Sequence, residues 1–260
     1  MAYDYEYLVK AVYDLTKIDL NSYKEKQMKR RIDALIAKNN VKGYDKYVEC
    51  LKTNKDMFDE FINYITINVS EFYRNPDQWK LLETNVLPAL IKKYGENLKI
   101  WSAACSTGDE PYTLVMVLSK FMPLNKIKIF ATDLDKTVIG KAKVGLYNEK
   151  SLAGLPKDLK DKYFTKIGSS YQISDEVKNR VEFKEHNLLR DTYPTNYHLI
   201  VCRNVLIYFT EEAKDEVFKK FNQALVPGGI LFIGSTEQII NHKELGFERQ
   251  SSFFYQRPEK

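Results

Sequence analysis

The sequence is poor in cysteine and histidine, and both shortages exclude classes of protein. Its three cysteines, Cys50, Cys105 and Cys202, are odd in number and far apart, which indicates a reducing compartment and no disulfide framework. No C-x-x-C pair or H-E-x-x-H motif occurs, and the three histidines are scattered. A structural or catalytic zinc site is therefore not expected.

Long apolar runs are also lacking. The longest, such as residues 230–233, are far too short to cross a bilayer, and the tyrosine-rich, acidic N-terminus is unlike a signal peptide. We therefore expect a cytoplasmic protein without direct membrane insertion. The net charge of +5 is mild, and it permits a nucleic-acid partner without indicating one. A length of 260 residues suffices for one large domain, or for a medium and a small one.

The first third of the chain is typical of helices throughout. Apolar residues recur at helical spacing from Tyr7 to Ile65, and glycine is almost absent there. We predict an all-helical domain over residues 1–75. A further helix over residues 79–94, after Pro76, would belong to a linker at 76–97.

The second helical segment of this part is strongly basic. It contains Lys24, Lys26, Lys29, Arg30 and Arg31. Two interpretations remain open. Most charge runs are solvated faces, whereas a basic face can also dock an acidic partner by electrostatic steering.

From Leu98 the pattern changes to strands that alternate with helices, as in parallel sheets. The rhythm breaks over residues 151–182, where two β-rich segments flank Gly168 as in a hairpin. We predict an α/β domain over residues 98–260. Its sheet would be Rossmann-like, mostly parallel and doubly wound, with a small antiparallel insertion at about 151–182.

The stretch over residues 98–114 organises this domain. An apolar run leads into small residues and Gly108, and Asp109, Glu110 and Pro111 then begin a helix. Strand, tight turn and helix form the first half of a nucleotide-binding βαβ unit. A dinucleotide site would require G-x-G-x-x-G, whereas the two carboxylates here repel phosphate. They suit the sulfonium and ammonium of S-adenosylmethionine, unless the turn is an ordinary connection.

Polar residues after later strands extend this candidate site. Asp133 follows the strand predicted at 126–132, in the place where an acid accepts hydrogen bonds from ribose hydroxyls, although Asp135 could serve as well. Three others also follow strands: Asn187, Arg203 and Asn204. Ligands of open α/β sheets lie at the carboxyl ends of the strands, so these residues are candidates for the cleft. Arg203 could instead cap a strand at the surface, and Tyr208 could be a core aromatic residue.

Five motifs stand in order along the chain: N-V-S-E-F-Y-R at 68–74, W-S-A-A-C-S-T-G-D-E-P-Y at 101–112, A-T-D-L-D at 131–135, C-R-N-V-L-I-Y-F at 202–209 and P-G-G at 227–229. Together they resemble the bacterial chemotaxis receptor methyltransferases of the CheR family. The resemblance covers nearly the whole chain, including its helical part. It implies a class I S-adenosylmethionine-dependent methyltransferase fold with a small β-subdomain.

The resemblance also implies an activity and a set of residues. Methyl groups would pass from S-adenosylmethionine to glutamate side chains of methyl-accepting chemotaxis receptors, giving γ-glutamyl methyl esters and S-adenosylhomocysteine. Arg74 and Tyr208 would be catalytic and face the receptor glutamate. The donor site would be lined by Asn68, Ser70, Arg74, Glu110, Asp133, Asn187, Leu188, Arg203 and Asn204. The basic helix would bind the cytoplasmic domain of the receptors, which would recruit a monomeric enzyme to their clusters in the membrane.

Two departures from the family pattern stand out. Ser70 replaces a threonine that is common in the family and keeps the hydroxyl. The hairpin around Gly168 is short, which argues against binding of the receptor's C-terminal tether peptide by this subdomain. The alternatives are a methyltransferase for another protein or a nucleic acid, and a non-catalytic sensor of S-adenosylmethionine.

Overall fold

The computed structural model describes residues 4–259, which divide into two compact units. The helical unit contains the chain up to Asn68 together with Tyr208–Asp215. The sheet unit contains Val69–Ile207 and the chain from Glu216 onward.

The helical unit is built from α1 (Tyr5–Thr16), the 3-10 helix η1 (Leu20–Ser22), α2 (Glu25–Lys38), α3 (Tyr44–Thr53) and α4 (Lys55–Thr66). Each α-helix buries one apolar stripe, which in α2 includes Met28, Ile32 and Leu35. Asp4 and Asn54 cap α1 and α4 by accepting a backbone N–H of the first turn. The all-helical N-terminal part predicted from the apolar spacing is confirmed.

The chain returns to the helical unit after it has formed most of the sheet unit. The backbone N–H of Lys24 donates to the carbonyl of Tyr208 at 2.9 Å. Phe209 forms an isolated antiparallel bridge with Tyr23, and their rings meet edge-on at 5.0 Å. Helix α11 (Glu211–Ala224) begins in this segment. Hydrophobic periodicity gives no sign of this return, because the contacts join residues far apart in the sequence.

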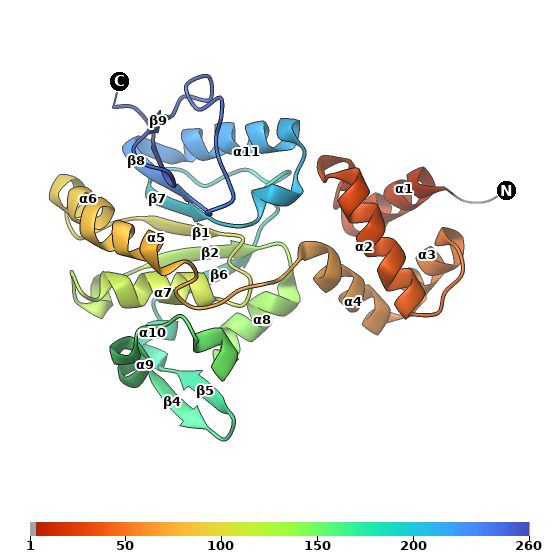
Figure 1. The fold of residues 1–260 in the computed structure, drawn as a ribbon, viewed down its shortest axis with the longest axis horizontal. Coiled ribbons are helices and arrows are strands. Elements are labelled where there is room, and N and C mark those ends of the chain that lie inside the picture. The colour runs from red at the N-terminus through yellow and green to blue at the C-terminus, as the bar shows by residue number, and fades with distance from the viewer. Residues whose placement is uncertain (1–3, 260) are drawn as a thin grey trace. The chain divides into compact units, whose positions relative to one another are not determined.

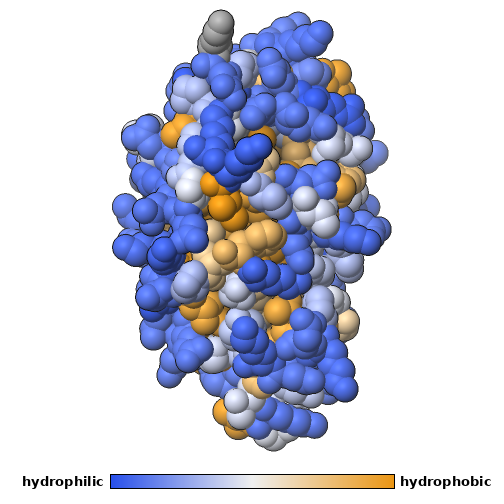
Figure 2. All heavy atoms as spheres, turned by 90° about the vertical axis from the view of Figure 1, so that its left-hand side faces the viewer, coloured by the Kyte–Doolittle hydropathy of each residue, from blue (hydrophilic) through white to orange (hydrophobic). Residues whose placement is uncertain are grey.

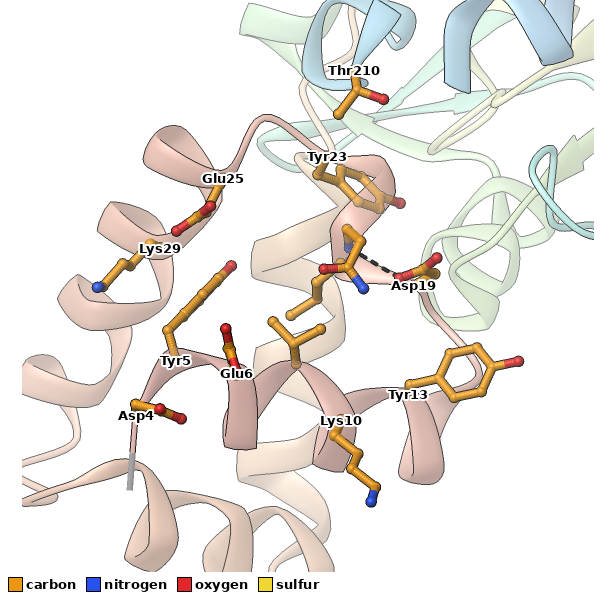
Figure 3. Close-up of a pocket in the computed structure, with 13 residues that line it drawn as sticks. Asp4, Tyr5, Glu6, Lys10, Tyr13, Asp19, Tyr23, Glu25, Lys29 and Thr210 are labelled. Atoms are coloured by element: carbon orange, nitrogen blue, oxygen red, sulfur yellow. Dashed lines mark hydrogen bonds between the residues drawn. The ribbon is translucent and has the colours of Figure 1, made fainter. Parts of the chain in front are cut away.

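A hollow of about 1000 Å³ opens between α1, η1 and α2 (Figure 3). Three tyrosines, Tyr5, Tyr13 and Tyr23, stand among acidic and basic side chains on its wall. The Nζ atom of Lys29 lies 5.5 Å from the centre of the Tyr5 ring. Burial, aided by Glu25, raises the pKa of Tyr5 to about 12. Lys29 thus lines the hollow as well as belonging to the basic helix.

A seven-stranded sheet in the order β6-β2-β1-β7-β8-β10-β9 organises the sheet unit. Its strands are β1 (Ile100–Ala103), β2 (Ile129–Asp133), β6 (Val181–Glu185), β7 (Tyr197–Cys202), β8 (Leu225–Ile233), β9 (Glu248–Arg249) and β10 (Phe254–Gln256). In this order, all strands from β6 through β2, β1 and β7 to β8 are parallel to one another. Strand β10 is antiparallel to both of its neighbours. The predicted Rossmann-like sheet is confirmed. Its strand order reverses between β1 and β7, where ligands of such sheets bind.

Helices cover both faces of this sheet (Figure 1). On the face of α11, the Trp101 ring lies 5.5 Å from that of Phe221 and 5.1 Å from that of Tyr193. The side chain of Ile100 points to the opposite face, because side chains alternate along a strand, and it shares a core cluster with α7 (Asp109–Leu118). Helix α8 (Lys136–Val144) follows β2. Burial on both faces explains why β1 reads as a continuous apolar run.

The helix predicted at 79–94 is instead three consecutive elements. They are α5 (Pro76–Leu81), a π-helical turn (Leu82–Val86) and α6 (Leu87–Tyr94). The N–H of Leu87 bonds to the carbonyl of Leu82, five residues back. The next residue, Pro88, has no N–H to continue an ordinary ladder. The spacing of apolar residues alone could not reveal that the helix changes to π-helical hydrogen bonding at 82–86.

A small antiparallel sheet in the order β3-β5-β4 is also part of the sheet unit. It consists of β3 (Leu146–Asn148), β4 (Phe164–Ile167) and β5 (Ser170–Ile173), with α9 (Lys157–Tyr163) and α10 (Asp175–Lys178) beside it in the chain. The predicted hairpin is β4–β5, and Gly168 takes a φ of 58° in its turn. The sheet also includes β3, which precedes the hairpin region and is too short to show an alternating pattern.

A shallow hollow of about 990 Å³ lies at the amino ends of the parallel strands. Apolar residues such as Ile100 and Ile129 line it together with Lys99 and Lys128. Figure 2, viewed from the side of α6, shows apolar side chains near the middle of a largely hydrophilic surface. The polar residues predicted to bind a ligand follow the carboxyl ends of these strands, at the opposite edge of the sheet.

Candidate functional site

The turn between β1 and α7 is tightly wound. Ala104, Ser106 and Gly108 have φ angles of 61°, 49° and 88°. A Cβ atom on Gly108 would lie 2.9 Å from the Cβ of Ala142 and 3.0 Å from a ring carbon of Tyr112. Glycine is therefore required there both by the backbone conformation and by the space. The small side chains leave the backbone open to a closely packed ligand.

Asp133 is the last residue of β2 and is only 7% exposed. Its two carboxylate oxygens accept backbone N–H groups of Ser106 at 2.8 Å and Asp135 at 3.0 Å. Burial raises the pKa of Asp133 to about 6, although these bonds oppose the rise. Each oxygen has a second lone pair, so Asp133 can still accept hydroxyl groups. Asp135, the other candidate, caps α8 by accepting the N–H of Thr137.

Glu110 lies in the first turn of α7 at the carboxyl end of β1. It accepts a hydrogen bond from Ser102 at 2.9 Å and lies 3.6 Å from the guanidinium of Arg203. Burial raises the pKa of Glu110 to about 6, against the opposing effects of Arg203 and Ser102. The side chain nevertheless remains 13% exposed.

Asp109 has a different role from its neighbour Glu110. It is 1% exposed and accepts a hydrogen bond from Thr107, and nearby Ser70 helps to lower its pKa. Burial raises the pKa of Asp109. Of the two acids that suggested a cationic ligand, Glu110 therefore keeps some access to solvent, while Asp109 lies in the interior.

Arg203 is the central basic residue of the site. Its Nε and Nη2 atoms both donate to Oε1 of Gln78, at 3.2 and 2.6 Å, and Nη2 also donates to the carbonyl of Arg74 at 2.7 Å. The guanidinium lies over the rings of Trp79 and Phe232, 5.2 and 4.8 Å from their centres. Arg203 is 8% exposed, so it is a buried cation rather than a surface strand cap.

Arg74 contributes its backbone to this network more than its side chain. Its carbonyl also accepts the indole N–H of Trp79 at 2.9 Å. Within the part of the chain that the structure describes, the half-buried guanidinium makes one hydrogen bond, to the carbonyl of Val69 at 3.1 Å. Because a guanidinium carries five N–H donors, most of its donors remain available for a ligand or substrate.

The remaining predicted site residues of the sheet unit lie on turns after β6 and β7. The side chain of Asn187 accepts the N–H of Leu189, and Leu188 is buried with its carbonyl bonded to Tyr193. Asn204 has a φ of 61°. The N–H of His186 donates to the carbonyl of Asp133 at 2.9 Å, so the turn after β6 adjoins the end of β2.

Asn68 and Tyr208 belong to the helical unit. The amide of Asn68 donates to the hydroxyl of Thr66 at 2.9 Å, and Tyr208 is partly buried. The other predicted residues belong to the sheet unit: Ser70, Arg74, Glu110, Asp133, Asn187, Leu188, Arg203 and Asn204.

Two residues of the network were missed from the sequence. Gln78 is 2% exposed and accepts two hydrogen bonds from Arg203. Glu237 is 5% exposed and accepts backbone N–H groups of the turn after β7. A polar residue beside Trp79 on an apolar helix face was a possible signal for Gln78. Nothing local in the sequence marks Glu237.

Comparison with known families supports this chemistry. Residues 68–253 match the family model described as "CheR methyltransferase, SAM binding domain", and residues 3–66 match "CheR methyltransferase, all-alpha domain". The chain belongs to the CheR methyltransferase family. It is accordingly an S-adenosylmethionine-dependent methyltransferase.

Curated members of the CheR family align over most of the chain. A chemotaxis protein methyltransferase of Listeria monocytogenes is 41% identical over 97% of this chain and 96% of its own length. One of Borreliella burgdorferi is 35% identical, covering 92% and 89%. Chemotaxis protein methyltransferase 1 of Pseudomonas aeruginosa is 34% identical, covering 86% of each chain.

The chemistry of the site suits the methyl donor of the family. Carboxylates such as Asp133 accept hydroxyl groups, and partly exposed Glu110 favours a cation. Within residues 4–259, no cluster of three or more histidine, cysteine or acidic residues could hold a metal ion. In the same range, no helix has the length and apolar character needed to cross a membrane.

Donor affinity is expected to fall as the pH drops through about 6, where Glu110 and Asp133 take up protons. Stability of the free protein should change in the opposite sense. Because both folded-state pKa values lie above their ordinary values, these groups contribute stability below pH ~4, and that contribution is lost as the pH rises through about 6. Calorimetric titration with S-adenosylmethionine and thermal unfolding between pH 5 and 8 measure the two effects. Affinity that stays constant across this range would contradict the assignment of both carboxylates.

Proposed function

We propose that this enzyme methylates glutamate side chains of methyl-accepting chemotaxis receptors, forming γ-glutamyl methyl esters. The observation that carries the proposal is the arrangement around Arg203, which connects Glu110 to the backbone of Arg74. Glu110 belongs to the predicted donor site, and Arg74 carries a guanidinium that suits a carboxylate substrate. The names of its relatives as chemotaxis methyltransferases favour the same substrate.

A carboxylate substrate requires orientation rather than deprotonation. Glutamate has an ordinary pKa of about 4.3 and is ionised at neutral pH. Arg74 would hold one carboxylate oxygen and leave the other to attack, and Tyr208 would donate to the same group. S-adenosylmethionine supplies the methyl group on a positively charged sulfur, and Ser70, Glu110, Asp133, Asn187, Leu188, Arg203 and Asn204 would hold it together with Asn68. The chain's own contribution is alignment and exclusion of water.

The direct test supplies labelled methyl donor to receptor-containing membranes with the purified enzyme. Label released from the receptor by mild alkali is the expected result, because carboxyl esters hydrolyse whereas N-methyl groups persist. Alkali-stable label, or label in nucleic acid instead, would overturn the assigned substrate. Donor bound without any transfer would instead identify a sensor.

We further propose that the helical unit docks the cytoplasmic domain of the receptor through α2, with the enzyme monomeric in the cytoplasm and recruited to receptor clusters. Lys26 and Arg30 are exposed and lie four residues apart on one helix face. Arg31 differs from them. Its Nη2 donates to the carbonyl of Tyr64, and its guanidinium lies 4.5 Å from the centre of the Tyr64 ring. Lys29 is exposed as well and lies over the Tyr5 ring, while Lys24 and Arg31 would contribute charge from less exposed positions.

The double variant Lys26→Glu/Arg30→Glu is expected to lower kcat/KM for receptor membranes on the order of tenfold, through loss of electrostatic steering. Donor affinity should stay unchanged. Methylation rates at two or more ionic strengths, with calorimetry for the donor, measure both quantities. The control variant Lys141→Glu/Lys143→Glu makes the same change of charge on α8 of the sheet unit. Equal losses in the two variants would show that overall charge matters and α2 does not.

A further inference from the structure

The turn after β7 is held from inside by a single carboxylate. Oε2 of Glu237 accepts the backbone N–H of Asn204 at 2.9 Å and that of Gly234 at 2.6 Å. Oε1 accepts the N–H groups of Val205 at 3.1 Å and Leu206 at 2.9 Å. Four backbone donors therefore converge on one side chain that is 5% exposed.

These contacts do more than satisfy a buried acid. Asn204 has a φ of 61°, which is uncommon for a residue with a side chain. A Cβ on Gly234 would lie 2.8 Å from each of Asn204 N and Glu237 Oε2, so the carboxylate fits closely against both strand ends. The turn it fixes begins directly after Arg203. An unusual backbone conformation persists only where its surroundings specify it, and Glu237 supplies those partners.

The charge of Glu237 also affects the pKa values of two other buried groups, Glu110 and Arg203. It contributes to raising the pKa of Glu110, and it opposes the lowering of the Arg203 pKa that burial causes. Glu110 is the carboxylate that lies against the guanidinium, at 3.6 Å. Burial raises the pKa of Glu237 itself, and its bonds to the N–H groups of the turn oppose that rise.

We propose that Glu237 is a positioning residue for the methyl donor, holding the turn at 204–206, which directly follows Arg203, so that Arg203 and Asn204 present their side chains to the donor. The inference rests on the proposed lining of the donor site by these two residues. Glu237 acts through the backbone and does not itself contact the donor.

The test measures the dissociation constant of S-adenosylmethionine for Glu237→Gln, Glu237→Asp and the wild type across pH 5 to 8. Glutamine keeps the size but brings an NH2 group against two N–H donors, and charged hydrogen bonds contribute more than neutral ones. Glu237→Gln is expected to weaken donor binding about tenfold or more. The fall in affinity at acid pH should move to lower pH, because Glu110 loses a negative neighbour. Glu237→Asp keeps the charge. It should therefore restore part of the donor affinity and bring the fall in affinity at acid pH back towards its wild-type position.

The control is Glu244→Gln, which removes an exposed acid seven positions further along the chain and should change neither quantity. The proposal is overturned if a folded Glu237→Gln protein binds the donor with wild-type affinity. It is also overturned if the fall in affinity at acid pH occurs at the same pH as in the wild type. Should that variant fail to fold, Glu237→Asp decides, since its shorter side chain cannot reach all four N–H groups, and unchanged donor binding would overturn the inference. Donor binding is measured without receptor, so failure here is distinct from failure to methylate receptor glutamates.

Discussion

Arg203→Ala is expected to lose donor binding by more than a hundredfold and to destabilise the fold by about 3–5 kcal/mol, the range for removal of one partner from a buried ion pair. The substitution leaves Glu110 without its cation and Gln78 without two donors. The cation also leaves the faces of two aromatic rings. Calorimetry with S-adenosylmethionine and denaturant unfolding measure the two losses.

Arg203→Lys separates charge from geometry at the same position. Lysine keeps the positive charge but cannot reproduce the planar fork that reaches Gln78, the Arg74 carbonyl and Glu110 together. We expect this variant to fold and still to bind the donor at least tenfold more weakly. Arg190→Ala is the control, since Arg190 is an exposed arginine of the same unit. A folded Arg203→Lys protein with wild-type affinity would show that the fork has no part in donor binding.

Arg74→Ala is expected to slow receptor methylation by about a hundredfold, the scale for a misaligned reacting group. Donor affinity and stability should change little by comparison. Among the described residues 4–259 the guanidinium makes one hydrogen bond, whereas the structural bonds at this residue use its backbone carbonyl, which alanine retains. Single-turnover methylation, donor titration and thermal unfolding separate the three quantities.

The interpretation of Arg74 as a mere structural tie makes a different prediction for the same variant. It predicts loss of stability rather than selective loss of rate. Arg74→Lys should recover part of the rate, because it keeps the charge without the fixed fork. Lys80→Ala removes a nearby exposed cation and serves as the control. Normal methylation by Arg74→Ala would end the proposed catalytic role.

Local patterns were sufficient for the elements that carry their own start and stop signals. Helix α8 covers residues 136–144, because Asp135 caps it and Gly145 ends it. The fold class followed from the alternation of strands and helices and from the five motifs.

The features that escaped prediction depend on contacts between distant residues. Gln78 receives bonds from Arg203, 125 residues away, and Glu237 bonds to N–H groups 31 to 33 residues away. Neither partnership leaves a periodic signal. Asp109 and Glu110 are adjacent in the sequence, yet their different surroundings give them separate roles. Composition and spacing cannot distinguish two such neighbours.

The bridge between Tyr23 and Phe209 has a practical consequence for anyone transplanting the helical unit into another enzyme. A graft taken only from the N-terminal end would leave behind the strand partner of Tyr23 and the carbonyl that receives the N–H of Lys24. It would expose the ring of Tyr23, which lies just before the basic helix α2. A working chimera must therefore exchange two stretches of sequence, with the second crossover placed inside α11 beyond Asp215.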